Sequence, residues 1–208
     1  VALVILSVPF KSHAKTFSYL FAQDEIIKLD TETDSIVTRV KSSSGVEGFI
    51  GNWDSRAVDI GNKYLLALYE HGDATGRPGF FVYDLQTLNR IKFVAIPETI
   101  KEPLDMKIIY PQKGTKFYVE VEDMVMNNGQ GGFINLAYDK KTHAYLSTVD
   151  NVIIDKDEEF WFSEDSTQIY VETEESNLHV YDSQTLQLIN IVDLSNIYTT
   201  SLWSKDVK

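Results

Sequence analysis

The sequence contains no cysteine, and this absence excludes two common ways of stabilising a small fold. No disulfide framework can form, and no metal site with cysteine ligands is available. The four histidines do not supply a metal site in place of cysteine, because none stands at a metal-ligand spacing from other histidines or carboxylates. We therefore expect neither a metal nor a cofactor on this chain.

Basic residues are also scarce. The chain has 19 Lys and Arg against 31 Asp and Glu, for a net charge of −12. Such a charge opposes binding to phosphate backbones and to anionic lipid, so we expect no nucleic-acid partner. The negative charge could favour cationic ligands, although an acidic surface often has no role other than keeping a protein soluble.

Motifs for catalysis are missing as well. No Gly-x-Ser-x-Gly occurs, and the glycine-rich run 129–132 has no helix after it to form a phosphate site. The acidic run 155–159 lacks the glycine and the terminal glutamate of a calcium loop. We expect no catalytic residue in this chain.

The N-terminal residues differ in character from the rest. Residues 1–10 form an apolar run that is too short to span a bilayer, and the small residues Ser12 and Ala14 fit a cleavage site before Lys15. We interpret residues 1–14 as the remnant of a secretory signal, which predicts a periplasmic or extracellular protein without a membrane span after cleavage. The alternative is an ordinary buried strand.

A short phrase recurs four times along the chain. Each copy has Asp, then Thr three residues on, then apolar residues; the aspartates are Asp30, Asp84, Asp139 and Asp182. They are separated by 84−30=54, 139−84=55 and 182−139=43 residues. This period is typical of a four-stranded β-propeller blade.

The recurrence of Asp followed by Thr three residues on has a physical explanation. An alternating strand ends at the aspartate, whose carboxylate can accept backbone N–H groups two or three residues on and hold a tight turn. A second β-branched run then returns antiparallel, forming a hairpin. No apolar pattern at helical spacing persists over twelve residues. The expected strands are 17–22, 25–29 and 35–40 in the first unit, 57–60, 63–70, 79–84 and 89–96 in the second, 106–110, 116–122, 133–139 and 144–149 in the third, and 159–163, 168–172, 178–182 and 186–194 in the fourth, with 201–204 as the first strand of a fifth.

This arrangement resembles the YVTN-type family of β-propellers, through Leu29-Asp30, Tyr83-Asp84, Tyr138-Asp139 and Tyr181-Asp182 with their threonines. It is more distantly similar to the propeller subunit of quinoprotein amine dehydrogenases. The name-giving tetrad of the family is absent, and no catalytic residue of a member can be placed here. Because such propellers usually have seven blades, the resemblance implies that residues 15–208 form about four antiparallel blades of a larger ring.

The two faces of such a propeller should differ. The Asp-x-x-Thr turns are short and lie on one face, whereas the connections 41–56, 71–78 and 123–132 are long and lie on the other. Sites usually occupy long loops on a rigid scaffold. The candidate ligand-binding residues on this face are Trp53, Asp54, Arg56, His71, Asp73, Arg77, Asn127 and Asn128. Several of them are also good turn formers.

Three functions remain open. The leading hypothesis is a secreted or periplasmic binding or scaffold module, whose long-loop face meets a partner protein or a small ligand. The second is a propeller subunit of an oxidoreductase, or a lactonase-like hydrolase, with catalytic groups outside this chain. The third is a purely structural cell-surface repeat.

Overall fold

The structure is a computed structural model that describes residues 17–22, 25–41, 56–59, 61–69, 77–100, 103–123, 132–149, 160–173 and 175–195. These residues form fifteen strands in four antiparallel sheets. The fold is all-β, and its sheets are the blades of a β-propeller, as the sequence predicts.

Each sheet is built from consecutive strands, so within a sheet every strand pairs with the strand before or after it in the chain. Blade 1 comprises β1 (Phe17–Ala22), β2 (Glu25–Asp30) and β3 (Ser35–Lys41). Blade 2 comprises β4 (Arg56–Asp59), β5 (Tyr64–Tyr69), β6 (Gly79–Asp84) and β7 (Arg90–Ala95). Blade 3 comprises β8 (Pro103–Ile109), β9 (Lys116–Asp123), β10 (Gly132–Asp139) and β11 (Tyr145–Val149). Blade 4 comprises β12 (Phe160–Phe162), β13 (Gln168–Glu172), β14 (Asn177–Asp182) and β15 (Leu188–Asp193).

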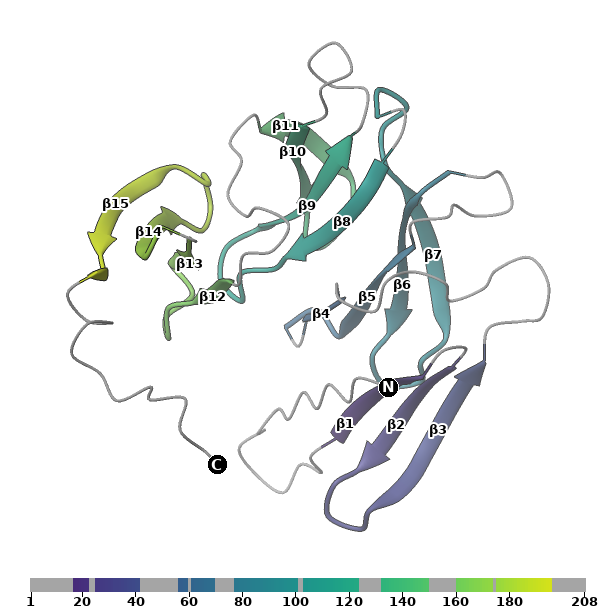
Figure 1. The fold of residues 1–208 in the computed structure, drawn as a ribbon. Coiled ribbons are helices and arrows are strands. Elements are labelled where there is room, and N and C mark those ends of the chain that lie inside the picture. Colours follow the sequence, from purple (N-terminus) through teal and green to yellow (C-terminus); the bar gives the residue numbers. More distant parts are fainter. Residues whose placement is uncertain are drawn as a thin grey trace, which may run out of the picture.

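The blades follow one another around a common centre (Figure 1). The strands β4, β8 and β12 lie on the inner side and β3, β7 and β15 on the outer side, and the ring is not closed. Blade 1 has three strands among the described residues, as expected, and β1 occupies the second position of a full blade because β2 and β3 form the hairpin of the Asp30 turn.

The cores of the fold lie between blades. Alternation along the strands sends successive side chains to opposite faces of a sheet, so blades 2 and 3 each contact one neighbour on either face. One buried cluster joins blades 1 and 2, a second joins blades 2 and 3, and a third joins blades 3 and 4. The cluster between blades 2 and 3 includes Phe80, Phe117 and Tyr138, whose rings pack against one another.

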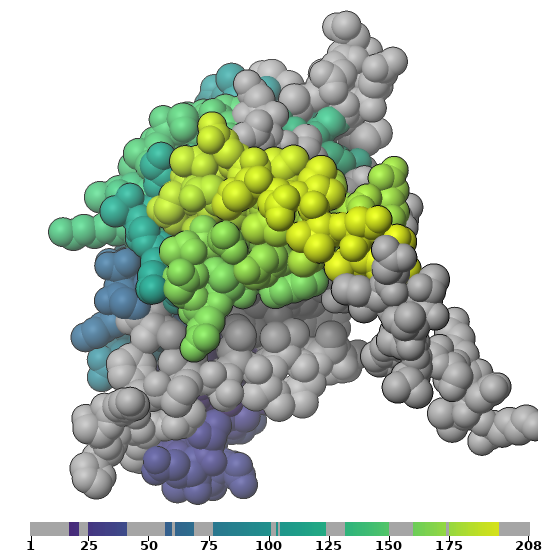
Figure 2. Space-filling model, turned by 90° about the vertical axis from the view of Figure 1, so that its left-hand side faces the viewer, coloured from purple at the N-terminus to yellow at the C-terminus, as the bar shows by residue number. Residues whose placement is uncertain are grey.

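The outer strand of blade 4 has no described strand beyond it. Figure 2 views the molecule from this side and shows β15, in yellow, at the surface. The side chains of Leu188, Ile189 and Ile191 on this strand are about half exposed.

The four aspartates are turn residues, which confirms the prediction from the sequence. Asp84 Oδ1 accepts the backbone N–H groups of Gln86 and Thr87 at 3.0 and 2.7 Å and the Thr87 hydroxyl at 2.9 Å. The turns at Asp139 and Asp182 repeat all three bonds, and that at Asp30 repeats the two backbone bonds. These bonds lower the pKa of Asp84, with Thr87 as the largest cause.

The residue after each threonine takes a left-handed backbone conformation. Its φ is 57° at Leu88, 60° at His143 and 58° at Leu186. In each case its N–H donates to the carbonyl of the turn aspartate at 2.8 Å, and its side chain is buried. The corresponding residue of blade 1, Asp34 (φ 51°), is exposed. In each of blades 2, 3 and 4, the turn therefore inserts one side chain into the interface with the preceding blade.

Candidate functional site

The two faces of the molecule carry different connections between strands. The short-turn face carries the four aspartate turns and the hairpins that join the first and second strands of blades 2, 3 and 4. These two kinds of turn are bonded to each other in the full blades: Leu85 N–H donates to Lys63 O, Lys140 N–H to Thr115 O, and Ser183 N–H to Thr167 O, at 2.8 to 3.0 Å. Backbone hydrogen bonds therefore hold the two turns of each full blade together on this face.

The long-loop face lies at the opposite ends of the strands. From it leave the connections 42–55, 70–78, 96–102, 124–131 and 150–159, which include the long loops noted in the sequence. Of the predicted ligand-binding residues, Trp53, Asp54, His71, Asp73, Asn127 and Asn128 lie outside the described residues. The predictions for them stand untested.

Arg56 and Arg77 fall within the described part of the chain. Arg56 begins β4. Arg77 precedes β6, and its Nη2 donates to the carbonyl of Ile96 at 3.0 Å, while its Nη1 lies 3.2 Å from Oε1 of Glu98. The Arg77 side chain therefore ties the start of β6 to the segment after β7, and it still leaves 42% of its surface exposed.

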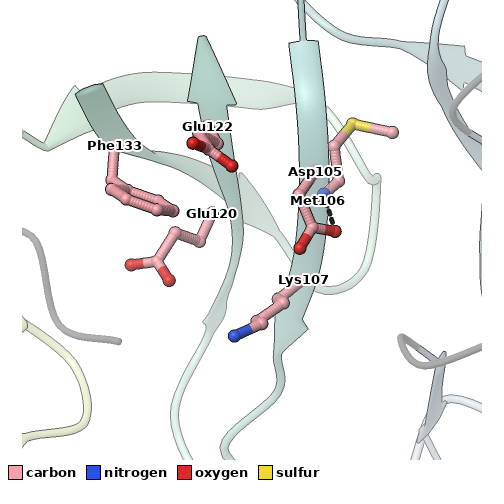
Figure 3. Close-up of a pocket in the computed structure, with 6 residues that line it drawn as sticks. All are labelled: Asp105, Met106, Lys107, Glu120, Glu122 and Phe133. Carbon is pink, nitrogen blue, oxygen red and sulfur yellow. Dashed lines mark hydrogen bonds between the residues drawn. The ribbon is translucent and has the colours of Figure 1, made fainter. Parts of the chain in front are cut away.

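A small pocket lies at the long-loop end of blade 3, and the predictions from sequence did not include it. Figure 3 shows its lining, which comes from β8, β9 and β10: Asp105, Met106, Lys107, Glu120, Glu122 and Phe133. Strand pairing arranges five of these side chains in two rows. Lys107 and Glu120 form one row, which Asn135 of β10 extends, and Asp105, Glu122 and Phe133 form the other.

The pocket replaces a stretch of apolar interface. Glu120 corresponds in strand register to Leu68 of blade 2, and Asn135 corresponds to Phe80. Glu120 and Asn135 are 2% and 0% exposed, and Asn135 Nδ2 donates to Glu120 Oε2 at 3.0 Å. A buried carboxylate and amide cost free energy relative to the leucine and phenylalanine of blade 2, unless they are fully bonded. Comparison of aligned repeats could have singled out Asn135, because the other blades have Ile26, Phe80 and Leu178 at its position. The position of Glu120 is less distinctive, since blade 4 has Glu172 there.

One carboxylate of the pocket, that of Glu122, lacks a described hydrogen-bond partner at one of its oxygens. The Oε2 atom of Glu122 is buried and has no hydrogen-bond partner among the described residues. Asp105 across the row accepts the backbone N–H of Met106 at 2.8 Å through Oδ1. With three carboxylates, one lysine and the ring of Phe133, the pocket carries a net negative charge and suits a cationic group.

A second polar cluster lies between blades 2 and 3 on the short-turn face, and its bonds are structural. Asp59 accepts the hydroxyl of Tyr110 and, at 2.7 Å, the amide of Asn62. Lys140 Nζ donates to the carbonyls of Pro111 and Lys113. Burial lowers the pKa of Lys140, opposed by the charge of Asp59. Burial also raises the pKa of Tyr110, and its bond to Asp59 adds to the rise. The bond between Tyr110 and Asp59 joins blade 3 to blade 2, and Lys140 is bonded within blade 3, so these bonds serve the fold.

No protein-family model matches the chain, and a search of curated proteins finds no match to it. Among the described residues, no group of three or more histidine, aspartate and glutamate side chains has an arrangement that could hold a metal ion. No helix in that part of the chain is long and apolar enough to cross a membrane.

Proposed function

We propose that this chain is part of a secreted or periplasmic β-propeller that acts as a binding or scaffold module through its long-loop face. The observation that carries the proposal is the blade 3 pocket, where Glu122 Oε2 is buried without a described partner at the long-loop end of the sheet. The ligand or partner is one that brings a cationic group, such as a lysine side chain or a small amine.

Three features support this proposal. On the short-turn face, backbone hydrogen bonds join the two turns of each of blades 2, 3 and 4, so these backbone groups serve the fold. The long-loop face carries the larger connections, and binding sites on a rigid scaffold usually lie in such loops. The net charge of −12 attracts a basic partner from a distance and speeds its encounter with the pocket.

A titration with a hexalysine peptide tests the proposal. We expect Glu122→Gln to weaken binding by about 10- to 150-fold, since a hydrogen bond to a charged group is worth about 1.5–3 kcal/mol. Glu32→Gln is the matched control, because it removes the same charge from an exposed position in the Asp30 turn on the short-turn face.

The comparison of the two variants distinguishes binding in the blade 3 pocket from electrostatic attraction to the net charge of the protein. If both variants weaken binding equally, the peptide senses only net charge and the pocket is not a binding site. Raising the salt concentration should weaken binding to the wild type and to Glu32→Gln in parallel.

A further inference from the structure

The turns of blades 2 and 3 on the short-turn face carry a charge opposite to that of the whole chain, which is −12. These turns comprise residues 59, 61–64 and 84–92 in blade 2 and residues 110–116 and 139–145 in blade 3. Their cationic residues are Lys63, Arg90, Lys92, Lys113, Lys116, Lys140 and Lys141, and their acidic residues are Asp59, Asp84 and Asp139. The net charge of the turns is therefore 7−3=+4, and we call them the basic patch.

Hydrogen bonds place the turns of the basic patch side by side. Within blades 2 and 3, the backbone bonds described above join the two turns of each blade. Between these blades, Nζ of Lys92 near the start of β7 donates to the carbonyl of Thr142 in the Asp139 turn. The cationic residues therefore gather at one place on the short-turn face, across the boundary between two blades.

The cations of the patch are more accessible than its carboxylates. Lys63, Lys113 and Lys141 are exposed, and their ammonium groups have no ion-pair partner among the described residues. The three carboxylates are buried or half-buried, and each accepts hydrogen bonds from neighbouring groups of the fold. A molecule that approaches this surface therefore meets ammonium groups first.

The basic patch ends where the turns of blades 1 and 4 begin. Those turns contain no cationic residue, and their acidic residues are Asp30, Glu32 and Asp34 in blade 1 and Glu164, Asp165 and Asp182 in blade 4. Lys113 lies close to this boundary, because its charge contributes to the lowered pKa of Asp165, after the larger effects of the bonds from Ser163 and Thr167. Carboxylates thus flank the basic patch on both sides.

The flanking carboxylates limit the kind of partner that fits. The phosphates of a nucleic acid and the headgroups of an anionic membrane each form an extended negative surface. Laid across this face, such a surface would also meet the acidic turns of blades 1 and 4, where like charges repel. A short acidic segment of a protein can contact the cations of blades 2 and 3 alone.

We propose that the basic patch binds a short acidic segment of a partner protein, such as a run of glutamates in a loop or a tail. Carboxylates of the segment accept charge-assisted hydrogen bonds from the ammonium groups of Lys63, Lys113 and Lys141. The patch lies on the face opposite the blade 3 pocket and takes a ligand of the opposite charge, so this proposal does not depend on the proposed function of the pocket.

Fluorescence anisotropy of a labelled hexaglutamate peptide at low salt tests the proposal. We expect Lys141→Gln to weaken binding by about 1.5- to 5-fold, which is the effect of one exposed ion pair. The variant K63Q/K141Q should weaken it by about 2- to 25-fold if the two effects add. Arg39→Gln is the matched control and should leave binding unchanged, because it removes one positive charge from a half-exposed side chain on β3.

Circular dichroism establishes that each variant is folded. Absence of hexaglutamate binding to the wild type at low salt would overturn the proposal. Equal weakening in Arg39→Gln and Lys141→Gln would also overturn it, since the peptide would then sense only the overall charge. An oligonucleotide that binds more tightly than hexaglutamate, and is lost from K63Q/K141Q, would assign the patch to nucleic acid instead. Self-association of the protein that is lost in K63Q/K141Q would assign it to acidic turns of a second copy.

Discussion

Replacement of His143 by leucine should remove an acid sensitivity that is built into the interface of blades 2 and 3. His143 is 3% exposed, and its ring packs edge-on against Tyr64 and Phe117 at centroid distances of 4.7 and 6.3 Å. Leu88 and Leu186 hold the same left-handed position in two other turns, so leucine is compatible with this backbone.

The magnitude follows from the pKa of this histidine. Burial, together with the charge of Lys92, lowers the pKa of His143 from 6.5 to about 4, against the opposing charges of Asp59 and Asp139. Between pH 6.5 and 4 the unfolded chain binds a proton that the folded protein does not, so folding stability falls as the pH falls. Over this window the loss approaches about 3 kcal/mol, at 1.36 kcal/mol for each pKa unit.

Urea unfolding followed by circular dichroism at several pH values between 4 and 8 measures this effect. We expect the His143→Leu variant to be at least as stable as the wild type at pH 8 and to lose less stability by pH 4.5. The reciprocal variant Leu186→His should steepen the loss. An unchanged slope in His143→Leu would refute the reasoning, because the proton uptake would then belong to other groups.

Three further predictions concern the turns, a strand and processing. Asp84→Ala and Asp182→Ala should each lower the free energy of unfolding by about 0.5–2 kcal/mol, by analogy with loss of a capping side chain, and leave hexalysine binding intact; loss of binding at an unchanged melting temperature would mean that the binding face is wrongly assigned. Gly79→Ala should cost about 1–3 kcal/mol in urea unfolding, since an added Cβ would clash with the carbonyl oxygen of Val94 in the paired strand, and a neutral result would show that β7 can move away. Mature protein from a secreting host should begin at Lys15 by mass spectrometry, and retention of Val1 in the folded product would favour the buried-strand interpretation.

The repeat made most of the fold predictable. Asp-x-x-Thr specifies a turn through short-range bonds, and alternation of apolar residues on both sides of it specifies the paired strands, so both features can be inferred locally. The strands around Asp84, Asp139 and Asp182 were expected within a few residues of their observed bounds. The three-stranded first blade was also expected from the pattern before Asp30.

The blade 3 pocket was not predicted, because its side chains meet only once the strands are in register. Glu120 and Glu122 are two residues apart on β9, which the sequence shows, but Asp105 and Phe133 reach them from two other strands. The role of Arg77 in joining β6 to the segment after β7 was hidden for the same reason. Loop composition favoured Trp53, His71 and the other long-loop candidates, and these remain predictions.

Sedimentation of residues 15–208 tests the open arc of blades most directly. Blade 4 exposes 44% of Trp161, whose counterparts Ala57 and Ile109 are buried by the next blade, so this end blade carries apolar surface that a neighbouring blade would cover. The open arc predicts self-association that increases with protein concentration. A compact monomer at all concentrations, with one cooperative melting transition, would contradict it, because four blades would then close on themselves.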